Sequence, residues 1–560
     1  MSKNSQPSRT TVQASEQGHS EDTATALWLG LALFFFYLLT TSGHPPYSDE
    51  AHYAIVAENI LTRGRPVLTE QMQRQADGQI RNVITYSWLP LGQSLLILPF
   101  AAIELITHEV LPAALSFIPH LVINSLPAAE SAATCALLFL LIRLLGRFQP
   151  ELRLSPGTAL AVALTTALAT QMWPASRTLF ADNSTTLLLT FAIYSLVRFR
   201  YLDIGPGWAL SAAWAAALAV LFKNNFILAS PALAAYGLWA VIERKRKRAA
   251  SDSSLFYLIL MAALPLVLVA ITQLWFNHLR YGSIWLSGYH EDRRGEFGFS
   301  TPLLAGLYGI LLSSGRSLFL YSPSCLLAFF GVRNFLTWAP AETGLIAGAS
   351  LPLLFTYAKL WSWDGGWEWG NRYHLFLIPL LTLLSIPAWR WMDQRLLPAA
   401  VRRVHQTSLM LLIAVSIYVQ GLGLLIHPAA YWRMAAANEM SVAVHRSYEK
   451  GVWDIRDNQL LLHFAPEFSP LAAHHWLIWA TWNRSRLDDR ALAVHAPWYS
   501  LNPKWAPKNV RPYLGFDLWF LTEWLTEEGS TIYAIMIVGL FAAMVGLCAI
   551  KLRSSIDYSP

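Results

Sequence analysis

The sequence has little charge and few cysteines. Only 14% of its 560 residues are Asp, Glu, Lys or Arg, against about 25% in an average soluble protein, whereas 54% are hydrophobic. The three cysteines, Cys135, Cys325 and Cys548, lie in apolar segments and show no CxxC or Cys/His spacing. We therefore expect neither a disulfide framework nor a zinc site. Apolar runs of about 17 residues or more indicate an integral membrane protein instead.

Other features are also missing. The first apolar segment, residues 26–41, has no short basic region before it and no clear cleavage site, which predicts a retained anchor. No basic soluble domain accompanies the net charge of +6, because the basic residues are scattered between apolar segments. The run 244–248 (RKRKR) is better explained as a determinant of membrane topology than as a nucleic-acid site. We expect no nucleic-acid partner.

The apolar pattern predicts an all-α bundle of about twelve membrane spans. A disordered tail (1–25) precedes the membrane domain (26–426), and a Trp-rich loop region (427–528) precedes the last span and tail (529–560). The predicted spans are 26–41, 121–145, 158–173, 185–196, 208–222, 226–242, 255–276, 311–330, 344–360, 373–389, 409–426 and 533–552. Basic residues are concentrated in alternate loops, which predicts that both termini are cytoplasmic and that the loop 42–120 lies outside.

The loop 42–120 carries two adjacent acids, Asp49 and Glu50, a short way beyond the first span. Apolar residues recur at helical spacing after them, which predicts an interfacial amphipathic helix with the acids at its N-terminus. The acids could merely cap that helix. Alternatively, one of them is a catalytic acid held at the membrane surface. A second apolar run, 89–106, is interrupted by Pro90, Gly92 and Pro99, so we expect an interfacial or re-entrant element.

Further candidate residues lie in the other predicted outer loops. Asp182 precedes the fourth span, where it could act as a helix cap or as a second active-site acid. Lys223, in the next outer hairpin, could snorkel to the interface or bind phosphate. Arg372 closes the segment 361–373 (WSWDGGWEWGNRY), in which glycines permit a tight turn and a guanidinium suits phosphate. Asp364 and Glu368 of this segment could instead neutralise Arg372.

Nine tryptophans lie between residues 427 and 528. Tryptophan is common at membrane interfaces and on surfaces that stack against sugar rings. Interface anchoring with a small core and sugar binding both remain open for this region.

Several of these segments resemble the GT-C glycosyltransferases, which include protein O-mannosyltransferases and aminoarabinose transferases. Residues 47–53 (YSDEAHY) resemble the family's first-loop motif, and 86–93 (YSWLPLGQ) its K-x-P-P-G-x element, although the lysine and one proline are absent. The segments 280–289, 312–323 (LSSGRSLFLYSP), 361–373 and 464–471 (FAPEFSPL) resemble further motifs of bacterial members.

The resemblance implies a GT-C-like bundle that transfers a sugar from a polyprenyl-phosphate donor to a hydroxyl acceptor on the outer face of a bacterial cytoplasmic membrane, with inversion. Asp49 would be the base, helped by Glu50, with Asp182 in reserve. The lipid phosphate would bind Arg372 first, with Lys223, Arg280 and His290 behind it. We expect substrate contacts from His52, Tyr86, Tyr321, Trp363, Trp369 and Tyr373. A divalent ion between Asp49 and Asp182 is conceivable, but no cofactor is predicted.

Two other classes of protein fit the same pattern. A flippase for a lipid-linked glycan would also have twelve spans and charged outer loops, but we find no matched pair of broken helices in two halves. A non-catalytic membrane scaffold could bind glycans through the Trp-rich region.

Overall fold

The computed structural model describes residues 9–74, 80–115, 117–202, 205–248, 253–288, 298–393, 398–435, 462–496, 511, 514–524 and 530–557. These residues are mostly helical, and the predicted all-α class is confirmed. The one sheet in this part of the chain is a hairpin of β1 (Thr69–Arg74) and β2 (Ile80–Thr85). Its strands pair in antiparallel register, with Thr69 opposite Thr85 and Arg74 opposite Ile80. The sequence pattern does not predict this hairpin.

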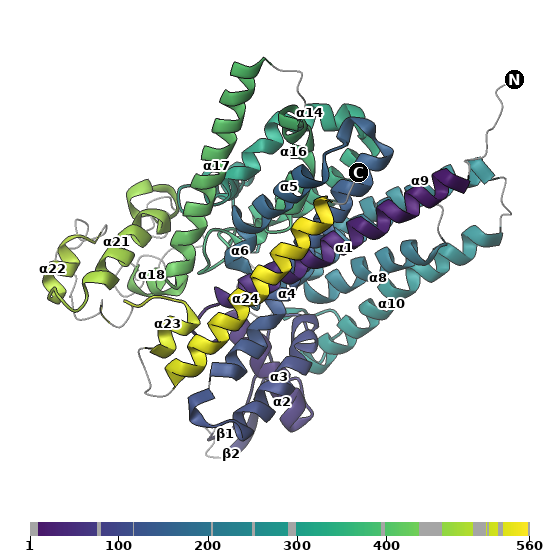
Figure 1. Ribbon diagram of the computed structural model, residues 1–560. Helices are drawn as coiled ribbons and strands as arrows, with labels where there is room; N and C mark the ends of the chain where they lie inside the picture. The colour runs from purple at the N-terminus through teal and green to yellow at the C-terminus, as the bar shows by residue number, and fades with distance from the viewer. Residues whose placement is uncertain are drawn as a thin grey trace, which may run out of the picture.

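Long helices run side by side along one direction and form the body of the molecule (Figure 1). The first and last helices pack against each other, so the two ends of the chain close the bundle. The helices of this body are α1 (Arg9–Leu39), α4 (Phe117–Phe148), α7 (Ala181–Tyr201), α8 (Gly207–Phe222), α9 (Ser230–Arg248), α10 (Ser253–Tyr281), α15 (Pro340–Lys359), α16 (Leu377–Asp393), α17 (Ala399–Leu425) and α24 (Ser530–Asp557). Asp22 on α1 pairs with Arg143 at 2.8 Å and Arg147 at 2.5 Å on α4.

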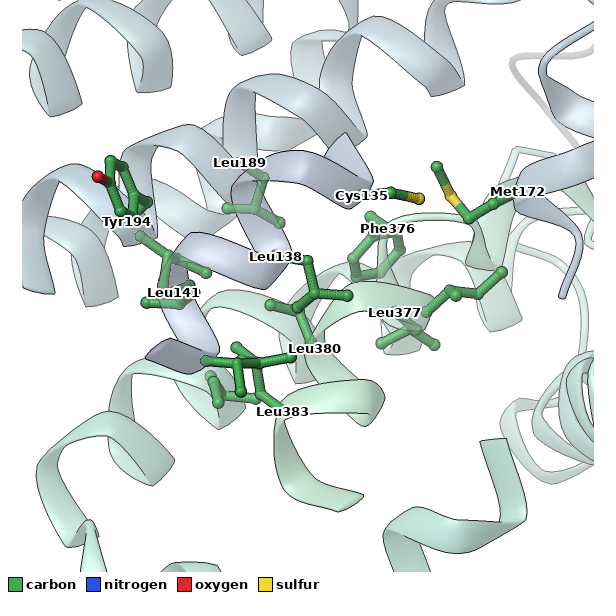
Figure 2. Close-up of a cluster of buried hydrophobic side chains, with 14 of the residues drawn as sticks. Cys135, Leu138, Leu141, Met172, Leu189, Tyr194, Phe376, Leu377, Leu380 and Leu383 are labelled. Carbon is green, nitrogen blue, oxygen red and sulfur yellow. The ribbon is translucent and has the colours of Figure 1, made fainter. Parts of the chain in front are cut away.

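The main core lies where α4, α7 and α16 meet. Figure 2 shows Cys135, Leu138 and Leu141 of α4 facing side chains of α7 and α16. In a bilayer the lipid is as apolar as leucine, so close packing and interhelical hydrogen bonds hold helices together. The interdigitated leucines supply that packing, and Tyr37 adds a hydrogen bond to the carbonyl of Ala167 (3.0 Å). All three cysteines are free and buried, as expected.

Seven helices in the described residues are long and apolar enough to cross a membrane, and four apolar helices are shorter. The predicted count of twelve therefore stays a prediction. One of the seven is α3 (Gly92–Val110), which runs through Pro99 without a break. Pro99 therefore does not interrupt the helix, and the interfacial or re-entrant position of this element stays a prediction.

The predicted span 311–330 is also wrong as one helix. The structure instead has α12 (Leu303–Leu312), the single turn α13 (Leu318–Tyr321), a 3₁₀ turn (Pro323–Leu326) and α14 (Leu327–Trp338). The polar residues 313–317 separate the first two, and Ser317 caps α13 by accepting a hydrogen bond from the amide of Leu320. Arg316, within this break, is fully buried.

The segments that carry the candidate residues gather at the end of the bundle away from the N-terminus (Figure 1). The helix α2 (Asp49–Arg63) begins at the predicted acids and ends at Gly64, whose φ of 68° is left-handed. Helix α5 (Pro156–Leu168) packs against α4 in the body of the bundle and leads to the short α6 (Met172–Ala175). After α17 come the shorter helices α18 (Pro428–Ala435), α21 (Pro470–Asn483), α22 (Asp489–Val494) and α23 (Trp519–Trp524). Helices α18, α21 and α22 enclose a small core of their own.

Candidate active site

Asp49 and Arg372 meet at the start of α2. The Arg372 Nη2 donates to Asp49 Oδ2 at 2.7 Å, and both side chains are largely buried. Asp49 occupies the first turn of α2, where the helix dipole favours a negative charge. Asp364 and Glu368, which could have neutralised Arg372, have other partners: Arg316 and His463 for Asp364, and Tyr47 for Glu368.

The loop before Arg372 depends on its glycines. Gly365, Gly366 and Gly370 have φ angles of 76°, 84° and 69°, which L side chains rarely adopt. A Cβ on Gly370 would also meet Gln171 Nε2 at 2.0 Å. The glycine-permitted turn predicted from the sequence is therefore confirmed.

Arg316 contacts this loop through the carbonyl oxygens of its backbone. Its guanidinium donates to the carbonyl oxygens of Glu368 (2.6 Å), Gly370 and Gly366. The Cζ atom of Arg316 lies 4.2 Å from the centre of the Trp432 ring. Burial lowers the pKa of Arg316, and the carboxylate of Asp364 opposes that shift. A buried arginine whose donors meet carbonyls fixes the loop geometry, so it positions Arg372.

Lys223 and Asp182 form a second buried pair beside the first. Lys223 Nζ lies 2.5 Å from Asp182 Oδ1, whereas Asp182 Oδ2 is buried with no hydrogen-bond partner. Phe180, and not Asp182, is the N-cap of α7, so the capping explanation of Asp182 is wrong. Burial lowers the pKa of Lys223, which the attraction of Asp182 opposes and the repulsion of Arg372 reinforces.

The two pairs face one cavity of about 300 Å³. Aromatic rings form much of its wall: Tyr357 and Tyr373 stack with centroids 4.5 Å apart, and Lys223 Nζ lies 4.9 Å from the Tyr373 centroid. Burial disfavours charge on Arg372, but Asp49, Tyr373 and Asp182 outweigh it and hold its pKa well above the ordinary value. The other lining residues of the cavity include Tyr53, Trp88, Asn224, Asn225, Gly288, Phe299, Trp361 and Ser362.

A third acidic side chain near the site is that of Glu368. Tyr47 donates to Glu368 and contacts the carbonyl of Trp367 at 3.1 Å, which ties the start of α2 to the Arg372 loop. Ser48, between Tyr47 and Asp49, has φ 54° and ψ −131° and is the one non-glycine residue with positive φ in the described chain. Such strain is commonly stored at functional sites.

Asp517 holds the chain that leads to Asp49. It accepts hydrogen bonds from Arg177 (2.6 Å), Ser42 (2.8 Å) and His44 (2.6 Å), and Arg177 also donates to the carbonyl of Leu424. Burial alone would raise the pKa of Asp517, but Arg177 and the neighbouring histidines hold it well below its usual range. The sequence gives no signal for Asp517, because it belongs to no recognisable motif and its partners lie hundreds of positions away.

The remaining predicted residues differ in their positions. Arg280 is buried and donates to the carbonyls of Ser87 (2.9 Å) and Leu89 (3.1 Å), so it anchors the segment before α3 and does not line the cavity. His52 and Tyr86 are half-buried and also lie outside the lining. His290 lies outside the described residues. Of the six predicted substrate contacts, Tyr373 lines the cavity.

Three others lie outside this lining, and their substrate contacts stay predictions. Tyr321, Trp363 and Trp369 are buried and do not line the cavity. Trp363 and Trp369 lie so close to Gly309 and Gly423 that an added Cβ would meet their rings at 2.3 and 2.4 Å. Their shared motif pattern reflects packing under the loop. In the described part of the chain, no group of three or more His, Cys, Asp or Glu side chains could hold a metal ion.

No family model and no curated protein matches this chain. Among solved structures, it is similar to ArnT from Cupriavidus metallidurans bound to undecaprenyl phosphate, with TM-score 0.43, 12% identity, and coverage of 94% of this chain and 77% of that one. The apo state of the same ArnT gives a TM-score of 0.41 and 14% identity, with coverage of 94% of this chain and 76% of that one. The chain is also similar to the archaeal oligosaccharyltransferase AglB from Archaeoglobus fulgidus in complex with an inhibitory peptide and a dolichol-phosphate. That comparison gives a TM-score of 0.42 and 12% identity, with coverage of 78% of this chain and 59% of that one. At these values the likenesses assign no function to the chain.

Proposed function

We propose that the protein is a membrane glycosyltransferase that moves a sugar from a polyprenyl-phosphate donor to a hydroxyl acceptor, with inversion. One observation carries the proposal: two cations and two carboxylates, paired as Arg372–Asp49 and Lys223–Asp182, face one cavity with aromatic walls. The cations suit a phosphate, the aromatic faces suit a sugar ring, and the carboxylates suit a hydroxyl that must lose a proton.

Arg372 would exchange partners when the donor binds. A phosphate oxygen competes with Asp49 for the guanidinium, because both accept hydrogen bonds from the same planar fork. The Asp49 carboxylate is then released toward the acceptor. Lys223 can turn in the same way from Asp182 to the phosphate, since it lies within ion-pair distance of that acid and lines the cavity.

The transfer step balances with these residues alone. Asp49 takes the proton of the acceptor hydroxyl as its oxygen forms a bond to the anomeric carbon. The bond from that carbon to the phosphate oxygen breaks, and its electron pair stays on the phosphate. Arg372 and Lys223 stabilise the charge that develops there, and fixed cations in a cavity with little water do this effectively.

The cavity would open on the outside of a bacterial cytoplasmic membrane. Two observations support this location: the apolar helices, and the position of α2 and its loop at the end of the bundle away from the N-terminus and the basic run 244–248 (Figure 1). Lipid-linked donors suit this side, where nucleotide sugars have no ready supply.

The test uses the full-length protein in lipid nanodiscs with a panel of synthetic undecaprenyl-phosphate monosaccharides. Release of undecaprenyl phosphate, with water or an added glycan as acceptor, is followed by mass spectrometry. Asp49→Asn should reduce release at least about 100-fold while the donor still binds. The control is Glu58→Gln, an exposed acid on the same helix, which should react like the wild type.

Two outcomes would contradict the proposal. One is no release from any donor by the wild type. The other is an Asp49→Asn protein that is as active as Glu58→Gln. A flippase would instead move the intact lipid across a vesicle membrane without releasing the sugar.

A further inference from the structure

A second, smaller cavity lies behind the Asp49–Arg372 pair, and we call it the inner chamber. Its lining includes Tyr47, Glu50, Glu368, Trp369 and Arg177. Its volume of about 30 Å³ has room for roughly two water molecules. It shares no lining residue with the larger cavity, although Glu50 directly follows Asp49.

Three residues of the inner chamber carry buried polar atoms that have no hydrogen-bond partner. These atoms are Glu50 Oε1, Arg177 Nε and Trp369 Nε1. The three residues are 4%, 6% and 4% exposed. An unsatisfied buried polar atom costs about 1–3 kcal/mol, and one acceptor together with two donors is a set that bound water can satisfy. The volume of the chamber and these three atoms together are the geometric basis for placing water there.

Two carboxylates of the chamber compete for charge. Burial raises the pKa of Glu50 well above its ordinary value, and repulsion from Glu368 adds to the shift, whereas Arg372 opposes it. Burial likewise raises the pKa of Glu368, against a hydrogen bond from Tyr47 and the attraction of Arg372. Both carboxylates thus respond to the charge on the Arg372 side.

Two histidines, His44 and His427, line the chamber. The centroid of the His427 ring lies 4.7 Å from the ring centroid of Tyr47 and 4.9 Å from that of His44. The side chain of His44 is 47% exposed. The charged and titratable groups around the two carboxylates are Tyr47, Asp49, Arg177, Arg316, Arg372, Asp182, Asp517, His44 and His427.

We propose that the inner chamber is a hydrated proton site, in which the Glu50–Glu368 pair takes up a proton from solvent when an anionic phosphate binds at Arg372. The proposal rests on the proposed function for the identity of that phosphate. Arg372 favours the deprotonated carboxylates, and a bound phosphate cancels part of its charge. The pair then gains affinity for a proton, which arrives from bulk water by way of the chamber.

The sign of the linkage is fixed. If phosphate binding promotes protonation of the pair, protonation must promote phosphate binding by the same factor. Undecaprenyl phosphate should therefore bind more tightly as the pH falls through the range where the pair titrates, which lies above that of an ordinary carboxyl group. We expect this linkage to amount to about a tenfold change in Kd.

Hydration of the chamber is tested on the wild-type fold. Exchange of indole N–H groups with D₂O is followed by NMR on protein labelled with ¹⁵N in the indole, and Trp369→Phe assigns the signal. Trp519 is the matched control, because it is 1% exposed but donates to the carbonyl of Leu38 at 3.1 Å. Trp369 should exchange at least about 100-fold faster than Trp519. Equally slow exchange would overturn the proposal.

Proton uptake is tested by calorimetry of undecaprenyl phosphate binding in buffers of different ionisation enthalpy. The wild type should take up more protons than Glu50→Gln or Glu368→Gln, and Glu58→Gln should equal the wild type. The second ionisation of the phosphate contributes equally to all four proteins, so the difference isolates the pair. Equal uptake in all four, or no binding of the phosphate, would overturn the proposal.

The two proposals can fail separately. Linked proton uptake with no sugar transfer from any donor would contradict the glycosyltransferase assignment alone. Transfer that depends on Asp49, combined with slow exchange at Trp369, would contradict the inner chamber alone.

Discussion

Arg372 and Asp49 lie 323 positions apart in the sequence and form an ion pair of 2.7 Å. The pair joins the start of α2 to the glycine-rich loop before α16. Both partners have lost most of their water, with side chains 15% and 13% exposed. A buried ion pair of this kind is a poor source of stability, because desolvation offsets the attraction. Its value lies in holding a guanidinium and a carboxylate at one cavity.

Substitution of Arg372 should weaken phosphate binding. Arg372→Lys keeps the charge but loses the planar fork, so the Kd for undecaprenyl phosphate should rise about tenfold. Arg372→Ala also leaves Asp49 buried without a partner and should cost more. Binding is measured by calorimetry in nanodiscs. Undecaprenol, which lacks the phosphate, should bind the variants and the wild type alike, and Arg403→Lys on the exposed face of α17 should change nothing.

Lys223 and Asp182 should be energetically coupled. Either Lys223→Met or Asp182→Asn leaves one buried group without its partner, which should destabilise the protein by about 3–5 kcal/mol. The double variant removes both and should lose less than the sum of the two. Unfolding by denaturant in detergent measures the three values. Additive effects would mean that the two side chains do not interact.

Ser48→Gly should stabilise the protein by about 1 kcal/mol. The backbone of Ser48 adopts a φ of 54°, which costs about 1–3 kcal/mol for a residue with a Cβ and much less for glycine. Ser48→Ala is the control, since it removes the hydroxyl but keeps the strain, and it should not stabilise. Thermal unfolding of the purified variants distinguishes them. A loss of stability in Ser48→Gly would show that the hydroxyl matters more than the backbone.

The sequence predicted those parts of the site that depend on local pattern. The helical spacing after Asp49 and Glu50 predicted α2 with its acids at the N-terminus, and the glycines of 361–373 predicted the turn before Arg372. The motif order also placed Asp49 and Arg372 in one site. The helix and the turn needed only the preferences of a few adjacent residues, whereas the shared site of Asp49 and Arg372 came from the order of the motifs along the chain.

The roles of three residues that act through tertiary contacts were missed. Asp517, Arg316 and Tyr47 position the site through contacts with backbone carbonyls or with residues hundreds of positions away. The aromatic pattern does not identify the lining residues, because Trp363 and Trp369 pack against glycines and do not line the larger cavity. The same tryptophan pattern fits a sugar-binding face and a buried layer, and only the tertiary packing decides between them.

The clamp of the Arg372 loop by Arg316 gives a further prediction. Arg316 is fully buried and its guanidinium contacts three carbonyl oxygens of the loop. Arg316→Met keeps much of the side-chain volume but leaves these oxygens without donors, each at a cost of about 1–3 kcal/mol. We expect a loss of roughly 3–5 kcal/mol, near the largest effects of single substitutions.

Arg316→Lys should recover part of this loss, because an ammonium can still donate to the carbonyls although it lacks the fork. Arg333→Met, on the exposed face of α14, is the control and should change stability by less than about 0.5 kcal/mol. Limited proteolysis adds a local readout, since a loosened loop should be cut between residues 361 and 372 before the helices unfold. If Arg316→Met unfolds like Arg333→Met and its loop resists cleavage, Arg316 does not hold the loop, and the position of Arg372 depends on Asp49 instead.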